Sequence, residues 1–322
     1  MKRREFIKST SGLALILPFN SSFNKLFDPK SEKMDYEKYT CKIGKYTCKI
    51  FKDLMFKYQG KDYFINASED EVKKELNRYK QTTENIPSPF IAMLLERENE
   101  KILIDTGIGY SKDPVVFRGN TYQFKGKLME ILDKENVDIN QITKVILTHF
   151  HPDHIGSIYN ETGQLNFPKA KFFIHEDEWN FWLSSKSNDQ PPLFKYFIEN
   201  NVSGLKDKNI ELIKGEEKEI LPGIRAIKTT GHTPGQIAVS IESENDKLLY
   251  ISDAFLHPLH IEHLDWKTNY DLDHELAKSS RENLLQLAYR ENMQINAFHF
   301  DFPGLGRVDK MKNNWKWVYT NK

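Results

Sequence analysis

One stretch decides the fold of this chain: Thr148-His149-Phe150-His151-Pro152-Asp153-His154-Ile155-Gly156, directly after an apolar segment at residues 143–147. Three imidazoles and a carboxylate fall within six positions, and these groups suit zinc as well as iron or manganese. His149 and His151, two apart in an extended turn, can point the same way towards one metal ion. Pro152 bends the chain, so that Asp153 and His154 can address a second ion beside the first. Small Gly156 lets the following helix pack closely.

Four side chains from one loop cannot complete two metal sites, so the remaining ligands must come from elsewhere in the chain. Three candidates follow segments that resemble strands. His232 lies in Gly231-His232-Thr233-Pro234-Gly235, Asp253 comes directly after Ser252, and His299 opens His299-Phe300-Asp301-Phe302-Pro303-Gly304. Because the ends of successive strands converge at one edge of a sheet, we expect these residues to meet the first cluster there.

The rest of the chain alternates between strand and helix patterns, which predicts a mixed α/β fold with two sheets. Ser68, with Glu71 three residues later, forms a capping box for a helix to about residue 79. We expect further helices at 127–135, 176–184 and 273–291. Strands are expected at 47–58, 62–67, 87–95, 101–104, 143–147, 171–174, 210–213, 224–228, 237–241, 248–251 and 295–298. No segment resembles an interdomain linker, so residues 45–310 are read as one domain and 311–322 as a C-terminal tail.

The N-terminal residues 1–35 are interpreted as an export signal and linker. Lys2-Arg3-Arg4-Glu5-Phe6-Ile7-Lys8 precedes the short apolar run at residues 12–19, the order found in secretory signals. The paired arginines resemble a bacterial twin-arginine signal, which exports folded proteins and predicts a periplasmic location. The alternative is a basic tail without a targeting role. No later segment is apolar enough to cross a membrane.

Composition narrows the choice of partners. The 322 residues carry 46 Lys and Arg against 46 Asp and Glu, so the formal net charge is zero. Without a basic excess the chain has no global field for a polyanion, which argues against nucleic acid as a partner. A small-molecule substrate is expected instead, and a homodimer stays open.

Two cysteines, Cys41 and Cys48, lie in a short tandem repeat around Gly44-Lys45. If that pair forms a two-residue hairpin turn, the cysteines face each other across the strands. A disulfide and two free thiols are both compatible with that geometry.

The combined pattern resembles the metallo-β-lactamase superfamily. The resemblance rests on His-x-His-x-Asp-His at 149–154, Gly-His-Thr-Pro-Gly at 231–235, the single Asp253 and the final His299, in that order. It covers residues 85–306 and implies an αβ/βα sandwich with a dinuclear metal site at the sheet edge.

The resemblance also implies a role for each residue. His149, His151 and His232 would bind the first metal ion, Asp153, His154 and His299 the second, and Asp253 would bridge the two. Asp153 and Asp253 are the catalytic candidates, and two divalent ions, zinc by preference, would activate a bridging hydroxide. Asp105, in Asp105-Thr106-Gly107, would orient a ligand imidazole.

Finer features select a branch of the superfamily. A bridging Asp253 is typical of its glyoxalase, lactonase and phosphotriesterase branches, whereas true β-lactamases lack it. The segments at 167–170, 178–182, 271–273 and 299–306 resemble the methyl parathion hydrolase group, which is similar to the quorum-quenching lactonases. The resemblance therefore implies a metal-dependent hydrolase of an ester, lactone or phosphotriester.

Four alternatives stay open beside this interpretation. They are a persulfide dioxygenase-like oxidoreductase with one iron, a glyoxalase II-like thioesterase, a β-lactamase and a nuclease. The absence of room for an inserted domain weighs against the nuclease.

Other residues have two interpretations. Trp179, Phe181 and Trp182 could line an apolar substrate pocket, although aromatic residues at helical spacing more often belong to a core. His257, His260 and His263 follow Asp253 and could contact substrate, although solvated loop histidines are more common.

Overall fold

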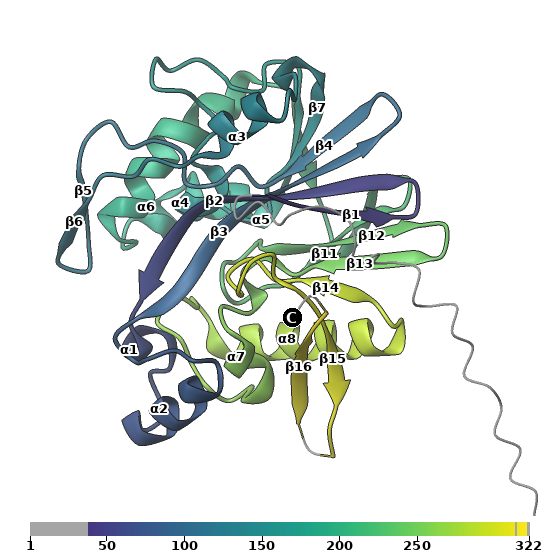
Figure 1. Ribbon diagram of the computed structural model, residues 1–322. Coiled ribbons are helices and arrows are strands. Elements are labelled where there is room, and N and C mark those ends of the chain that lie inside the picture. The colour runs from purple at the N-terminus through teal and green to yellow at the C-terminus, as the bar shows by residue number, and fades with distance from the viewer. Residues whose placement is uncertain (1–37, 313, 321–322) are drawn as a thin grey trace, which may run out of the picture. The chain divides into compact units, whose positions relative to one another are not determined.

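The computed structural model describes residues 38–312 and 314–320, which form two seven-stranded sheets (Figure 1). This is the expected αβ/βα sandwich. Helix α3 lies against the first sheet and the long helix α8 against the second, so each sheet is covered on its outer side. The expected export signal in residues 1–35 lies outside the described residues. Among the described residues, no helix is long and apolar enough to cross a membrane.

The first sheet has the strand order β1-β2-β3-β4-β7-β8-β9. Its strands are β1 (Lys38–Ile43), β2 (Tyr46–Tyr58), β3 (Ile86–Arg97), β4 (Glu100–Ile104), β7 (Ile142–Ile146), β8 (Lys171–His175) and β9 (Ile210–Ile213). From β4 onwards the strands pair in parallel. Residues Ser88–Leu95 of β3 are buried without interruption, as expected for a strand covered on both faces.

The second sheet has the strand order β10-β11-β12-β13-β14-β15-β16. Its strands are β10 (Glu217–Leu221), β11 (Ile224–Lys228), β12 (Ile237–Ser243), β13 (Asp246–Tyr250), β14 (Gln294–Asn296), β15 (Leu305–Lys310) and β16 (Trp315–Tyr319). A separate two-stranded hairpin consists of β5 (Val115–Phe117) and β6 (Asn120–Tyr122). The predicted strands at 224–228, 237–241 and 295–298 are found as β11, β12 and β14, with small shifts at their ends.

The helices are α1 (Gly60–Tyr63), α2 (Glu69–Arg78), α3 (Leu128–Lys134), α4 (Pro152–Ile155), α5 (Glu176–Trp182), α6 (Pro192–Phe197), α7 (Pro258–Glu262) and α8 (His274–Arg290). Short 3-10 turns cover Ile139–Gln141, Ser185–Ser187, Ser203–Asp207 and Ser252–Ala254, and a π turn covers Ile198–Val202. The capping box predicted at Ser68 and Glu71 is confirmed at the start of α2. The strand predicted at 62–67 is wrong. Tyr63 and Phe64 are both buried although adjacent, which the end of one helical turn allows and a strand with one buried face does not.

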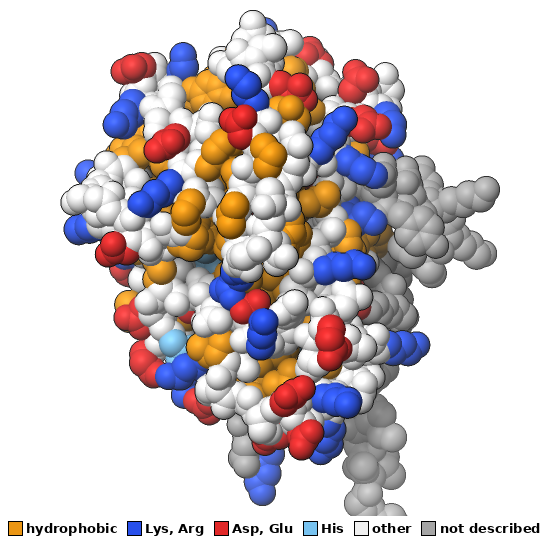
Figure 2. Space-filling view, turned by 90° about the vertical axis from the view of Figure 1, so that its left-hand side faces the viewer, with side chains coloured by type: hydrophobic (Ala, Val, Ile, Leu, Met, Phe, Trp, Pro, Cys, Tyr) orange, Lys and Arg blue, Asp and Glu red, His pale blue; other side chains and the backbone are white. Residues whose placement is uncertain are grey.

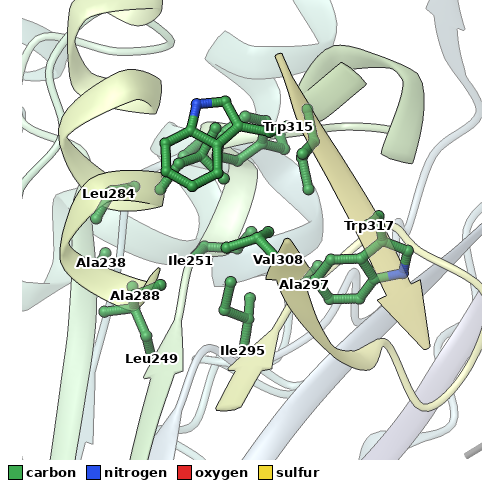
Figure 3. Packing of buried hydrophobic residues seen from close by; sticks show 14 of the residues in the cluster. Ala238, Leu249, Ile251, Leu284, Ala288, Ile295, Ala297, Val308, Trp315 and Trp317 are labelled. Carbon is green, nitrogen blue, oxygen red and sulfur yellow. The ribbon is translucent and has the colours of Figure 1, made fainter. Parts of the chain in front are cut away.

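The apolar core beneath α8 includes side chains of the last strand, β16, and so makes this strand part of the domain (Figure 3). Helix α8 buries residues at helical spacing, namely Ala277, Arg281, Leu284, Leu285 and Ala288. Trp315 and Trp317 of β16 belong to the same apolar cluster. Residues 311–322 were expected to form a tail, but Trp315–Tyr319 pairs with β15 and closes the sheet. At the other end the first described strand, β1, begins at Lys38, before residue 45, where the domain was expected to start.

The predicted hairpin around Gly44-Lys45 is present, and Cys41 pairs directly with Cys48 across β1 and β2. Both thiols are buried and free in this structure. The hydrogen bond that the Cys48 thiol donates to Cys41 and the burial of that thiol raise the pKa of Cys48 well above its usual range.

Candidate metal centre

Strand ends bring the seven predicted ligands together. The first four follow β7 and enter the short helix α4, and the other three follow β11, β13 and β14 of the second sheet. Close approach depends on Gly156, because a Cβ there would lie 1.8 Å from the carbonyl oxygen of Ile108. The small residue expected at this position is therefore required by the backbone on the other side.

The first cluster contains His149, His151, His232 and Asp253, whose ligand atoms all lie within 4.8 Å of one another. Nε2 of His232 lies 2.9 Å from Nδ1 of His151 and 3.5 Å from Oδ2 of Asp253. All four side chains are buried. Three imidazoles and one carboxylate around a common centre match the donor set of a divalent metal ion.

The second cluster contains Asp153, His154, Asp253 and His299, again within 4.8 Å. Nε2 of His299 lies 3.0 Å from Oδ2 of Asp253, and Nε2 of His154 lies 3.2 Å from its Oδ1. Asp253 thus belongs to both clusters and lies between them, where a bridging ligand belongs.

Buried atoms without partners show that these residues fit metal ions. Nε2 of His149, Nε2 of His154 and Oδ2 of Asp153 are buried, with no hydrogen-bond partner among the described residues. Unpaired buried polar atoms are costly and rare, and these atoms point into the two clusters. A cation in each cluster would supply the missing partner.

Asp105 holds the ligand loop as predicted. Its carboxylate accepts hydrogen bonds from Nδ1 of His154 at 2.8 Å, the Tyr250 hydroxyl at 2.9 Å and the Thr148 amide at 2.8 Å. The backbone at Asp105 has a φ of 58°, a strained value that persists where the surroundings enforce it. The contact with His154 leaves that ring's Nε2 free to face the cluster.

Asp271 orients the His232 imidazole as Asp105 orients that of His154. The sequence did not predict this role of Asp271. Its Oδ1 lies 3.2 Å from Nδ1 of His232, and Arg281 donates two hydrogen bonds to the same carboxylate at 2.8 and 3.0 Å. Burial raises the pKa of Asp271, but the Arg281 guanidinium outweighs burial and holds it well below its usual range. A permanently ionised carboxylate therefore fixes the tautomer of His232.

Glu178 of α5 connects the two ligand loops. Its Oε1 accepts from the Phe150 amide at 2.8 Å and from Nε1 of Trp182 at 2.7 Å. Its Oε2 accepts from the Thr233 hydroxyl at 2.6 Å and the Gly235 amide at 3.0 Å. One carboxylate thereby fixes the His149–His151 turn relative to the turn that carries His232.

The electrostatics of the ligand residues agree with a cation site. Burial, followed by repulsion from neighbouring imidazoles, lowers the pKa of His149 and of His151 well below the usual range. Both rings are therefore neutral, the form that binds metal. Burial opposes ionisation of Asp253, but His299 and His154 outweigh it and hold its pKa low.

A pocket with about 500 Å³ of empty space, counted together with the solvent at its mouth, opens onto five of the ligands, and we call it the aromatic chamber. The ligands at its floor are His151, Asp153, His232, Asp253 and His299. Its walls are Phe56, Tyr58, Tyr63, Phe90, Ile108, Phe117, Phe124, Pro152, Leu193, Phe194, Leu256 and Tyr270. No Lys or Arg occurs among the described residues that line it.

Two sequence interpretations change here. Trp179, Phe181 and Trp182 do not line the chamber, and Trp182 instead packs beside His151 with ring centres 5.9 Å apart. The sequence favoured a solvated loop for His257 and His260. In the structure, His257 is buried at the N-terminal cap of α7 and His260 is buried within this helix. Neither of these histidines lines the chamber, so their contacts are structural.

Comparison with known proteins agrees with this geometry. The sequence pattern of the Metallo-beta-lactamase superfamily matches residues 92–292. The chain is 26% identical over 222 residues to an N-acyl homoserine lactonase of Bacillus sp, covering 63% of this chain and 78% of that protein. It is 31% identical over 175 residues to the uncharacterized protein YobT of Bacillus subtilis (strain 168), covering 52% and 62%.

Two solved structures share the fold. The dizinc quorum-quenching lactonase AidC, solved with a product bound, superposes with a TM-score of 0.74 at 24% identity, covering 88% of this chain and 97% of that one. The hydrolase AbOPH gives a TM-score of 0.76 at 21% identity with the same coverage.

Fold and site together define a two-sheet α/β sandwich with two buried His/Asp clusters that share one aspartate. The chain belongs to the metallo-β-lactamase superfamily, since the match spans most of its length. Within it, the chain is similar in sequence to an N-acyl homoserine lactonase and shares its fold with AidC and AbOPH.

Proposed function

We propose that this chain is a metal-dependent hydrolase whose substrate is an uncharged ester, lactone or phosphotriester with an apolar group. The observation that carries this proposal is the aromatic chamber, which leads from the surface to the ligand clusters. A wall of aromatic and aliphatic side chains favours an apolar group by burial, at about 25 cal/mol per Å².

The chamber disfavours two other substrate classes of the superfamily. β-Lactams and glutathione thioesters both carry carboxylates, which a binding site normally pairs with a cationic side chain. None of the described lining residues is Lys or Arg, so such a carboxylate would find no cationic side chain in the chamber. The similarity to the N-acyl homoserine lactonase of Bacillus sp favours a lactone within the proposed class.

The ligand roles are part of the proposal. His149, His151 and His232 would hold one ion and Asp153, His154 and His299 the other, with Asp253 between them. Two bound divalent ions, which we propose to be zinc, would supply Lewis-acid activation of water and of the substrate's reacting oxygen.

The chain's own residues orient and protect this chemistry. Asp105 and Asp271 fix the tautomers of His154 and His232, and the aromatic walls exclude bulk water. The Asp153 carboxylate lies at the chamber floor, with Oδ2 beside His154 and His299 of the second cluster. Its other oxygen could therefore accept a proton beside the reacting group.

The deciding experiment measures kcat/KM on a panel of lactones, aryl esters, aryl phosphotriesters, thioesters and β-lactams. We expect a neutral member with an apolar group to be preferred, with activity lost on chelation and restored by zinc, cobalt or manganese. A clear preference for β-lactams or S-acylglutathione would overturn the substrate class.

Metal content is measured on the same samples. We expect two divalent ions per chain, and Asp253→Asn should lose at least one because this residue belongs to both clusters. Asp265→Asn serves as the matched control, because that aspartate lies outside the candidate metal clusters with 81% of its side chain exposed. A fully loaded protein with one iron would favour the oxidoreductase alternative instead.

A further inference from the structure

Tyr270 carries a hydroxyl without a partner. It lies in the segment between α7 and α8, and its hydroxyl is buried with no hydrogen-bond partner among the described residues. Its side chain lines the aromatic chamber together with the ligands Asp153, Asp253 and His299. Buried hydroxyls in proteins nearly always have a partner, so this exception requires an explanation.

The ring of Tyr270 is held on several sides. Tyr58 and Tyr63 contact it edge-on, with ring centres 5.3 and 5.9 Å away. The Arg118 guanidinium lies over its face at 4.6 Å and is itself paired with Asp62. Turning the hydroxyl towards another protein group would break these contacts, so the donor is fixed in place.

The hydroxyl is a donor under all ordinary conditions. Burial is the largest influence and raises the pKa of Tyr270 well above its usual range, although Arg118 opposes this. A neutral phenol can donate a hydrogen bond without bringing a negative charge into the chamber.

Position separates Tyr270 from the reacting atoms. The Tyr58 ring contacts both Tyr270 and the ligand His299, with ring centres 5.3 and 6.0 Å away. Tyr270 also lines an outer hollow that Phe117 and Arg118 of the β5–β6 hairpin form with Pro191. It therefore lies at the junction of chamber and surface, where the arm of a substrate would pass.

The surface around this junction is apolar. Figure 2 views the face on which β5 and β6 lie in Figure 1 and shows hydrophobic side chains spread over its centre. Val116 in β5 and Leu272 beside Tyr270 are among the exposed large hydrophobic residues. Both also line the outer hollow beside the polar Arg118, Gln190 and Asn269, so an apolar arm would still meet apolar side chains as it leaves the chamber.

Resting on the proposed function, we propose that Tyr270 determines specificity by donating a hydrogen bond to an acceptor on the arm of the substrate. The substrate class narrows accordingly to neutral esters or lactones whose apolar arm carries an amide or carbonyl oxygen apart from the bond that is hydrolysed. Such an acceptor would give the Tyr270 hydroxyl the hydrogen-bond partner that it lacks. A substrate arm without an acceptor would leave this hydroxyl buried and unpaired.

The test compares two γ-butyrolactones that differ only in the arm, one with a hexanoylamino group and one with an alkyl group of equal length. Tyr270→Phe should lower kcat/KM about tenfold for the amide-bearing lactone and by less than about twofold for the alkyl lactone. The wild-type chain should prefer the amide-bearing lactone, and the variant should lose that preference.

Tyr63→Phe is the matched control, because its hydroxyl already has a partner in Ser88 at 3.1 Å. It should affect both lactones equally and lower Tm, since a satisfied hydrogen bond is lost. Tyr270→Phe should leave Tm unchanged or raise it, since the hydroxyl that it removes has no partner in the free protein. A structural role for Tyr270 would instead lower Tm and reduce both activities together.

The outcomes separate the two proposals. Equal losses on both lactones in Tyr270→Phe, with an active wild-type chain, contradict the role of Tyr270 and leave the proposed function intact. A wild-type chain that is inactive on both lactones and on every other neutral substrate contradicts the proposed function and the role of Tyr270 with it.

Discussion

At the scale of single residues, the ligands could be predicted and their supports could not. Four of the seven ligands lie within six positions of the sequence, so spacing alone indicates their chemistry. Glu178 has partners at Phe150 and Gly235, 28 and 57 positions away, and no local pattern records such contacts. The same holds for Asp271, whose partner His232 is 39 positions away.

Glu178→Gln tests the connection between the ligand loops. Both carboxylate oxygens accept two hydrogen bonds, so the amide nitrogen of glutamine must face a donor whichever way it turns. We expect a loss of about 1–3 kcal/mol in the free energy of unfolding, measured by urea denaturation, together with weaker metal retention against a chelator.

Glu176→Gln on the same helix is the control for this variant. Its carboxylate is partly exposed and pairs with Lys214 at 3.5 Å, so the free energy of unfolding should change by less than about 0.5 kcal/mol. Equal stability and equal metal retention in the two variants would show that Glu178 does not hold the loops.

At the scale of elements, α7 shows why histidines near a ligand need not be functional. His257 caps the helix by accepting from the Leu259 amide, and its Nε2 lies 2.9 Å from Oε1 of Gln81. Nε2 of His260 lies 2.8 Å from the carbonyl oxygen of Tyr63, which places a neutral ring beside α1. The sequence pattern gave no sign of this burial, because the covering residues come from α1 and α2.

The buried His260 predicts a pH dependence of stability. Burial lowers its pKa to about 3, whereas the unfolded chain titrates near 6.5. Its stabilising contribution is therefore complete above pH 6.5 and is lost as the pH falls from there towards 3, because only the unfolded chain takes up the proton. From pH 7 to pH 5 this single site should cost about 2 kcal/mol.

Other groups, including the metal ligands, titrate in the same range, so the measurement compares two chains. Urea unfolding of the wild type and of His260→Gln at pH 7, 6 and 5 should give a shallower loss of stability for the variant, whose amide keeps a donor for Tyr63. Parallel curves for the two chains would rule out His260 as a contributor.

At the scale of the whole described chain, the ligands join the two sheets. His149, His151, Asp153 and His154 follow strand β7 of the first sheet, and His232, Asp253 and His299 follow strands of the second. The motif therefore predicted the sandwich as well as the site. It did not predict the β5–β6 hairpin, whose strands have only three residues each. It did not predict β16 either, in which Trp315 and Trp317 alternate with exposed residues.

Removing the metal ions should weaken the whole assembly of sheets. An ion bound at 1,000 times its Kd stabilises by about 4 kcal/mol, which corresponds to about 10 °C in Tm for a domain of this size. We expect EDTA, which removes both ions, to lower Tm by at least this amount and zinc to restore it, as followed by calorimetry. Asp253→Asn should show a smaller shift, and a Tm unaffected by chelation in the wild type would argue against ions that connect the sheets.

The paired thiols of β1 and β2 have a practical consequence for spectroscopy. Cys41 and Cys48 are the chain's two cysteines, and both are buried in the first sheet. A single cysteine introduced at exposed Val116, on the hairpin beside the aromatic chamber, would therefore be the one thiol open to a maleimide dye. Quenching of that dye by the surrounding tyrosines would report how the hairpin moves as a substrate arrives, without first removing either native cysteine.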